Sequence, residues 1–469
     1  MLIPNSCNGF SISNRIFSLT GGLTAALSAR SLAGTDAGAR NEHASQRRSE
    51  KNHVFLEFAK AAALRIETAF VRNRISSASA ETVLFLIQLA SATGEVRYLK
   101  TASLGADYLV ATWRELVDRP DKGLVSDQSS NLSLYGGLAG VAYVLNETGK
   151  ATNNDRYCEA ARTATDYIVR AAKAVGSGLA WSDAPGIAGD GSIVLYLLYA
   201  AREFESALYG ITAERAGDHI LEIGSNERFG GFSWSGFPAF PGLPKDAYLP
   251  AFEDGTAGIV YVFARLYSET KKARFLFAAN QGASHLQRVA TDSNRVDLIS
   301  HPLSDLPDLH YAGFCHGPAG TARAFFELYK ITREPVYQIW AEQIAQKALQ
   351  SDTLGNLTQD SWNVLCQCCG SPAVIDLFVE MWAFTQRLDY LATAKRAASH
   401  LLNEERNSEG KRARKFQTLA YADQRKINTE TDYFVGPLGV GSALLLLHLA
   451  VHGEYSSIHF PDNRVANVR

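Results

Sequence analysis

The sequence predicts an all-α protein in which about seven helical hairpins close into an α/α toroid. Two observations predict this fold. A turn of small residues followed by an apolar helix recurs along the chain, and the segments between the copies are amphipathic helices. Helices that are apolar on nearly every face are expected to be buried, whereas amphipathic helices expose one face to water. An inner and an outer ring of helices follow from this division.

The repeated turn has a period near sixty residues, with 49 to 69 residues between the last small residues of consecutive copies. A first, glycine-poor copy is expected in "SASAETVLFLIQLASATGE" at 77–95. The other copies are "YGGLAGVAYVLNET" from 135, "PGIAGDGSIVLYLLYAARE" from 185, "EDGTAGIVYVFARLYSET" from 253, "CHGPAGTARAFFELYKIT" from 315, "CCGSPAVIDLFVEMWAFT" from 368 and "VGPLGVGSALLLLHLAVH" from 435.

The intervening segments, such as "RYLKTASLGADYLVATWREL" and "RYCEAARTATDYIVRAAKAV", place apolar residues at helical spacing with charges opposite. They are predicted to form the outer ring. An open helical solenoid whose glycine turns serve only as caps is the alternative. The seven copies and the cysteines in the turns favour the closed ring, which we assign to residues 53–455.

The composition is that of an ordinary globular protein, with 46% hydrophobic and 20% charged residues among 469. A net charge of −2 and the lack of a long apolar run predict neither a nucleic-acid partner nor a membrane span. The expected location is cytoplasmic, either free or held at a membrane by a biosynthetic complex. Residues 1–52 are expected to be a disordered leader or linker, with a weak export signal as the alternative, and 456–469 a tail.

The cysteines point to a metal site rather than to disulfides. Cys315 and Cys368 are 53 residues apart, which is one repeat, so both thiols are expected at the same rim of the ring. Cys369 adds a third sulfur. Three thiolates would leave one tetrahedral position of a zinc ion open, as in catalytic sites. Cys366 or His316 could replace one of these ligands, and buried apolar cysteines are the alternative to any metal.

These motifs resemble those of the lanthionine synthetase C-like family, the lanthipeptide cyclases, over roughly residues 55–455. The family's first zinc motif, Trp-Cys-(His or Tyr)-Gly-x-Pro-Gly, is similar to the stretch from Phe314 to Gly320. Its second motif is usually Cys-His-Gly, and Cys368-Cys369-Gly370 resembles the subset with an all-cysteine zinc site. The resemblance implies an α/α toroid with a central catalytic Zn²⁺ ion, bound here by Cys315, Cys368 and Cys369.

The resemblance is incomplete among the acid and base residues. Asp183 matches the family's aspartate before the third turn, but Asp254 stands where a histidine usually opens the fourth. Tyr311 replaces a common arginine. We expect His316 to act as the acid, Asp183 as a base or orienting group, and Asp254 in an undetermined acid–base role. The alternatives are helix-capping aspartates and a turn histidine that binds backbone.

The implied function is the addition of peptide cysteine thiols to dehydroalanine or dehydrobutyrine, which forms thioether rings. The expected partners are a precursor peptide with dehydrated serines and threonines and a separate dehydratase. One alternative is the addition of glutathione or a similar thiol to dehydroamino acids. Another is a LanC-like scaffold that has lost catalysis, and a toroidal glycosidase or epimerase is the least favoured because it would not use the three cysteines.

Overall fold

A computed structural model describes most of the chain between residues 54 and 455. The described ranges are 54–68, 79–118, 131–226, 231–234, 249–292, 313–350, 367–368, 370–407, 433–434 and 436–455. The predicted leader at 1–52 and the tail at 456–469 lie outside these ranges, as do Cys7, Tyr311, Cys366 and Cys369. The domain boundaries therefore stay a prediction.

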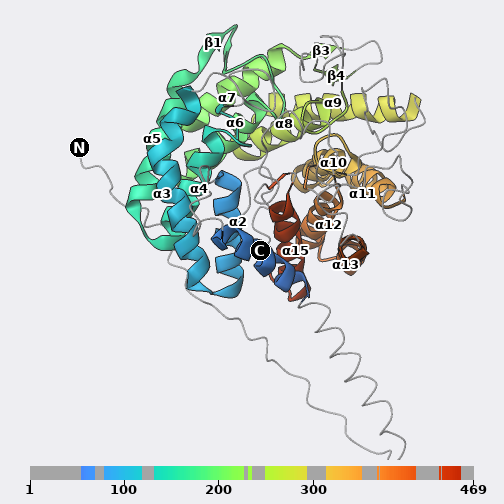
Figure 1. The fold of residues 1–469 in the computed structure, drawn as a ribbon. Coiled ribbons are helices and arrows are strands. Elements are labelled where there is room, and N and C mark those ends of the chain that lie inside the picture. Colours follow the sequence, from blue (N-terminus) through green and yellow to red (C-terminus); the bar gives the residue numbers. More distant parts are fainter. Residues whose placement is uncertain are drawn as a thin grey trace, which may run out of the picture.

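Within the described ranges, seven inner helices form a closed ring, which confirms the predicted α/α toroid. Figure 1 shows the chain passing around this ring in sequence order until α15 meets α2. The inner helices are α2 (Ala80–Thr93), α4 (Leu138–Thr152), α6 (Asp190–Glu203), α8 (Thr256–Thr270), α10 (Pro318–Thr332), α12 (Ser371–Thr385) and α15 (Pro437–Val451).

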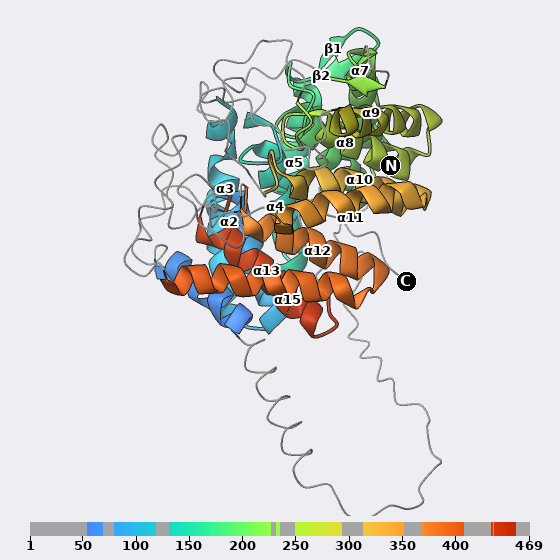
Figure 2. The same ribbon diagram turned by 90° about the vertical axis from the view of Figure 1, so that its right-hand side faces the viewer.

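Each of the first six inner helices packs against the outer helix that follows it, as Figure 2 shows for the hairpins α10–α11 and α12–α13. The outer helices are α3 (Val96–Asp118), α5 (Asp155–Ala171), α7 (Ala207–Glu222), α9 (Ala273–Asp292), α11 (Pro335–Gln350) and α13 (Leu388–Asn407), with a further helix over 54–68. Two short hairpins, β1 (Lys173–Val175) with β2 (Gly178–Ala180) and β3 (Ser225–Asn226) with β4 (Phe232–Ser233), follow α5 and α7.

Burial separates the two rings as the sequence pattern predicts. Every residue of α10 from Pro318 to Leu328 is buried, whereas α3 buries only a stripe that includes Tyr98, Ala102 and Leu109. The stripe follows from the helical spacing of its apolar residues. No helix in the described part of the chain is both long and apolar enough to cross a membrane.

The last inner helix closes the ring against the first. The hydroxyl of Ser442 on α15 donates a hydrogen bond to the side-chain oxygen of Gln88 on α2, at 2.9 Å. A Cβ atom on Gly441 would come within 3.1 Å of the Phe85 ring and 3.4 Å of Ala62, so the contact among the three helices is close.

A close backbone approach requires the glycine near the start of the inner helix in four of the turns. In four turns this glycine lies against the carbonyl oxygen of the residue six positions earlier, at distances of 1.9 to 2.3 Å from where a Cβ would stand. The pairs are Gly140 with Leu134, Gly258 with Phe252, Gly320 with Phe314, and Gly439 with Tyr433. A side chain at these positions would force the turn away from its helix.

Hydrogen bonds between the backbones of consecutive turns, which we call the rim hydrogen bonds, bind the turns to one another. The backbone N–H of Ala188 donates to the carbonyl oxygen of Glu253 at 3.0 Å. The N–H groups of Phe252 and Glu253 donate to the Cys315 oxygen at 3.1 and 2.9 Å. The rim hydrogen bonds continue around the ring. The N–H groups of Phe314 and Cys315 donate to the Cys368 oxygen at 2.7 and 3.1 Å, and the Cys368 N–H donates to the Phe434 oxygen at 3.0 Å.

Ion pairs join the inner helices farther along their length. Lys330 of α10 pairs with Glu327 on its own helix and, at 2.8 Å, with Glu380 of α12. All three side chains are at most 5% exposed. Arg265 of α8 reaches Glu327 at 3.4 Å, so buried charges link three consecutive inner helices.

The glycine contact predicts opposite effects for two glycine-to-alanine changes. Gly140→Ala should destabilise the fold by about 1–3 kcal/mol, because its Cβ would stand 2.2 Å from the Leu134 oxygen. Gly210→Ala on the outer helix α7 meets nothing closer than 3.6 Å and should stabilise by about 0.5–1 kcal/mol. Urea unfolding followed by circular dichroism measures both. If both substitutions changed the unfolding free energy equally, the close approach of the Leu134 oxygen to position 140 would be contradicted.

The buried ion pairs predict a large effect of removing their shared cation. Lys330→Met leaves Glu327 and Glu380 in the interior without that ammonium and should cost about 3–5 kcal/mol in unfolding free energy. Lys272→Met removes a cation whose side chain is 44% exposed and which pairs with Glu214, so it should cost less than about 1 kcal/mol. Urea unfolding at neutral pH compares them. If Lys330→Met lowers the unfolding free energy no more than Lys272→Met does, the prediction is wrong.

Candidate metal centre

Three consecutive turns bring the predicted site residues of the fourth, fifth and sixth repeats together. Asp254 precedes α8, Cys315 and His316 precede α10, and Cys368 precedes α12. The rim hydrogen bonds place the Cys315 backbone in direct contact with that of Cys368 on one side and of Glu253 on the other. Residues 53 and 62 positions from Cys315 therefore meet beside it.

His316 lies buried against the carboxylate of Asp254. Its Nε2 atom is 3.3 Å from the Asp254 Oδ2 atom, and the two side chains are 10% and 6% exposed. Burial lowers the pKa of His316, but the hydrogen bond and charge of Asp254, with the charges of Glu253 and Cys368, outweigh it and raise the pKa above 6.5. The ring thus holds a proton more readily than a free histidine does.

Atoms that could hold a metal ion gather around this histidine. One ligand atom each from Glu253, Cys315 and His316 lies within 4.8 Å of the others. In a tetrahedral zinc site, bond lengths of about 2.0 Å to oxygen or nitrogen and 2.3 Å to sulfur separate ligands by roughly 3.3–3.8 Å. Small side-chain adjustments would therefore bring these atoms onto one ion. The donor types and their burial fit zinc.

The other residues singled out in the sequence either lie outside the described residues or lie apart from this cluster. Cys369 and the alternative ligand Cys366 lie outside the described residues. Asp183 is exposed in the third turn. Cys158, which the sequence places outside the turns, is buried on α5 and forms a disulfide, so the expectation of no disulfides is wrong at this cysteine.

Two carboxylates in these turns went unnoticed in the sequence. Glu253 directly precedes Asp254, and only the repeat position of "EDG" could have indicated it. Asp190, the first residue of α6, is buried, and its carboxylate accepts hydrogen bonds from the Trp181 N–H at 2.9 Å and the Ser182 hydroxyl at 2.7 Å. Burial raises the pKa of Asp190 to about 6 although these bonds lower it. Asp190 thus fixes the third turn.

Arg323, which no sequence motif had indicated, lies against the aromatic side chains of two turns. Its guanidinium carbon is 5.4 Å from the Phe314 ring centre and 5.9 Å from that of Phe252, and its Nε atom is 3.5 Å from a Glu380 oxygen. The cation thus joins the turns of the candidate centre to the buried ion pairs below.

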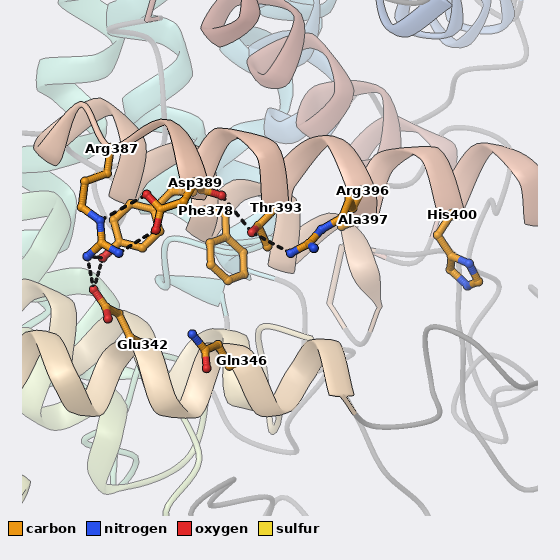
Figure 3. A pocket seen from close by; sticks show the side chains of 10 residues that line it. Glu342, Gln346, Phe378, Arg387, Asp389, Thr393, Arg396, Ala397 and His400 are labelled. Carbon is orange, nitrogen blue, oxygen red and sulfur yellow. Dashed lines mark hydrogen bonds and ion pairs between the residues drawn. The ribbon is translucent and has the colours of Figure 1, made fainter.

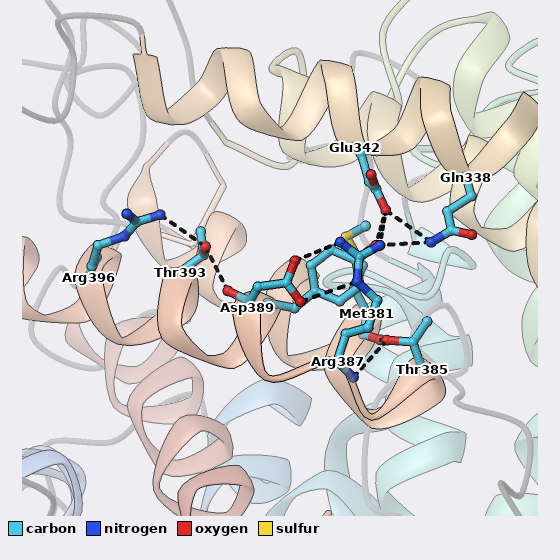
Figure 4. Close-up of polar contacts among 9 residues, drawn as sticks. Gln338, Glu342, Met381, Thr385, Arg387, Asp389, Thr393 and Arg396 are labelled. Atoms are coloured by element: carbon cyan, nitrogen blue, oxygen red, sulfur yellow. Dashed lines mark hydrogen bonds and ion pairs between the residues drawn. The ribbon is translucent and has the colours of Figure 1, made fainter.

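A separate hollow of about 480 Å³ lies at the outer ring, between α11 and α13 (Figure 3). Arg387, which directly precedes α13, pairs there with Glu342 of α11 at 2.5 Å and with Asp389 at 2.6 Å (Figure 4). Arg396 donates to the Thr393 hydroxyl at 3.1 Å. No residue of the three turns lines this hollow, so it is not part of the candidate metal centre.

Residues 69–419 match the family model described as lanthionine synthetase C-like protein. The chain belongs to the lanthionine synthetase C-like family. The family match spans most of the toroid and includes the turns with Cys315 and Cys368. It agrees with the resemblance carried by the two cysteine motifs.

One solved structure supports the fold of this lanthionine synthetase C-like protein. Nisin cyclase matches with a TM-score of 0.59 at 15% identity, over 86% of this chain and 97% of its own. The cellobiose 2-epimerase of Spirochaeta thermophila has a TM-score of 0.40 at 12% identity, over 74% of this chain and 97% of its own. A heparin-specific unsaturated glucuronyl hydrolase has a TM-score of 0.38 at 14% identity, over 64% and 84%. The last two similarities are too weak to support an argument. No curated protein sequence matches the chain.

The raised pKa of Asp190 predicts a pH-dependent stability. The folded chain holds this proton up to about pH 6, whereas the unfolded chain releases it near 3.8, so stability is lost as pH rises between these values. Asp190→Asn removes the titration. As pH rises from 4 to 7, the unfolding free energy of the variant should increase relative to that of the wild type by on the order of 3 kcal/mol, because one pKa unit corresponds to about 1.4 kcal/mol.

Urea unfolding at several pH values measures this difference. Glu159→Gln, which changes an exposed carboxylate on α5, is the control and should follow the wild type. A difference between Asp190→Asn and wild type that does not change with pH would contradict the assignment.

Proposed function

We propose that this protein is a zinc-dependent cyclase that adds peptide cysteine thiols to dehydroalanine and dehydrobutyrine, forming lanthionine and methyllanthionine. The observation that carries the proposal is the meeting of Cys315, His316, Cys368 and Asp254 in three adjoining turns of a lanthionine synthetase C-like toroid. The substrate would be a precursor peptide whose serines and threonines a separate dehydratase has already dehydrated.

The proposed zinc ligands are Cys315, Cys368 and Cys369. Zinc, when bound, holds a peptide thiol as its thiolate, which is a far better nucleophile at neutral pH than a thiol of pKa near 8.5. Cys315 and Cys368 are suited to this role because the rim hydrogen bonds fix their backbones before any ion binds. Preorganised ligands reduce the reorganisation that accompanies binding.

His316 is the proposed acid. Addition of the sulfur to the β-carbon of a dehydroamino acid places negative charge on the adjoining enolate, whose α-carbon must then take a proton. His316 is suited to donate it because its pKa is raised by the carboxylate of Asp254. Asp254 would thus orient the imidazole and favour its protonated form, while Asp183 would accept the thiol proton from its exposed position in the third turn.

Two experiments test the proposal. Purified wild type should contain about one zinc per chain, and Cys315→Ala should lose most of it, because removal of a ligand weakens zinc binding at least about tenfold. Cys158→Ala, which removes a buried cysteine outside the turns, should keep the metal. Elemental analysis measures both, and a wild type without zinc overturns the metal site.

Activity is measured by incubating the protein with a dehydrated cysteine-containing peptide and counting the cysteines that remain open to alkylation by mass spectrometry. The wild type should protect them, and His316→Ala should slow protection by about 10²–10⁴-fold. Glutathione adducts on the peptide instead of rings would identify a thiol-adding enzyme, and neither product would identify a scaffold without catalysis.

A further inference from the structure

We infer that Glu253 binds the zinc ion in the resting protein and leaves it when the substrate thiol arrives. The inference deepens the proposed function and rests on its metal site. The sequence places Glu253 one residue before Asp254, but the two carboxylates are given different partners by the fold. Asp254 faces His316, whereas Glu253 joins both Cys315 and His316 in one cluster of possible ligand atoms.

The backbone of Glu253 is held from both sides by rim hydrogen bonds. Its N–H donates to the Cys315 oxygen at 2.9 Å, and its own carbonyl oxygen accepts the N–H of Ala188 at 3.0 Å. The Cα atom is thus fixed between the third and fifth turns. The residue is half-buried, so it lies at the boundary between the buried cluster and solvent.

The charges around His316 favour a cation at this place. Asp254 and Cys315 are 4% and 3% exposed, and the ligand atoms of Glu253, Cys315 and His316 lie within 4.8 Å of one another. Several groups that carry negative charge when ionised therefore share a site with little water, which is unfavourable unless a positive ion compensates them. A divalent ion next to Glu253 supplies that compensation.

The chemistry of the exchange is balanced. When a peptide thiol binds, Glu253 would release the ion, the peptide sulfur would take the vacated position as a thiolate, and the thiol proton would pass through the proposed base, Asp183, to water. A fourth ligand that can leave satisfies two needs. It keeps the ion bound between turnovers, and it still opens the position that a catalytic zinc site requires.

The test compares Glu253→Gln with wild type in two measurements that should change in opposite directions. Zinc affinity, from competition with a chromogenic chelator, should fall by about 10- to 100-fold because a ligand is lost. Binding of N-acetylcysteine to the cobalt-loaded protein, followed by the sulfur-to-cobalt charge-transfer band, should tighten by about tenfold because no carboxylate competes. Glu159→Gln should change neither.

A variant-free measurement keeps the inference testable if Glu253→Gln fails to fold. X-ray absorption on the zinc-loaded wild type should show one oxygen neighbour at about 2.0 Å beside sulfurs at about 2.3 Å, and N-acetylcysteine should replace that oxygen with a sulfur. Because a bound water would give the same oxygen, infrared difference spectra of protein labelled with carbon-13 glutamate should also show a carboxylate band that shifts when zinc binds and returns when N-acetylcysteine is added. The absence of such a band would overturn the role of Glu253.

The outcomes separate the inference from the proposed function. If zinc binds the wild type and is lost in Cys315→Ala, but Glu253→Gln alters neither measurement or weakens thiol binding, the role of Glu253 is overturned and the cyclase proposal stands. An all-sulfur zinc shell in the resting wild type has the same consequence. If the wild type binds no zinc, both fail.

Discussion

The hydrogen bonds between consecutive turns determine where the backbones of Glu253, Cys315 and Cys368 lie, and with them the neighbouring Asp254 and His316. They run from backbone to backbone, so they do not depend on which side chains occupy the turns. The turns can therefore carry Glu253 and Asp254 in one repeat, Cys315 and His316 in the next and Cys368 in the third without loss of alignment. The glycines that lie against the turn carbonyls make this backbone arrangement possible.

The candidate centre and the interior of the ring are connected through α10. Arg323 contacts the rings of Phe252 and Phe314 at its upper side and Glu380 below, and Glu380 in turn pairs with Lys330. Buried ion pairs add little net stability but are costly to break, so they favour one alignment of the helices over others. The helices below the turns that hold the cysteines are thus fixed in one alignment by buried ion pairs.

The sequence predicts the ring because its signals are local and periodic, as in the apolar run of α10 and the stripe on α3. It also predicts which cysteines meet, since one repeat separates Cys315 from Cys368. Left-handed residues at the ends of inner helices, such as Lys271, Arg333 and Gln386, have no such signal because glycine or asparagine is usual there. The cluster position of Glu253 and the burial of Asp190 depend on contacts between repeats, which no local pattern encodes.

The pairing of Ser442 with Gln88 has a consequence for biogenesis. The two residues are 354 positions apart, so at least that length of chain must follow Gln88 out of the ribosome before they can meet. Until then, the edge of α2 that later receives α15 stays open in the nascent chain and exposes apolar surface. Contacts of such long sequence separation form slowly and leave intermediates prone to aggregation. Production of this protein should therefore benefit from slow translation and from chaperones that shield that edge.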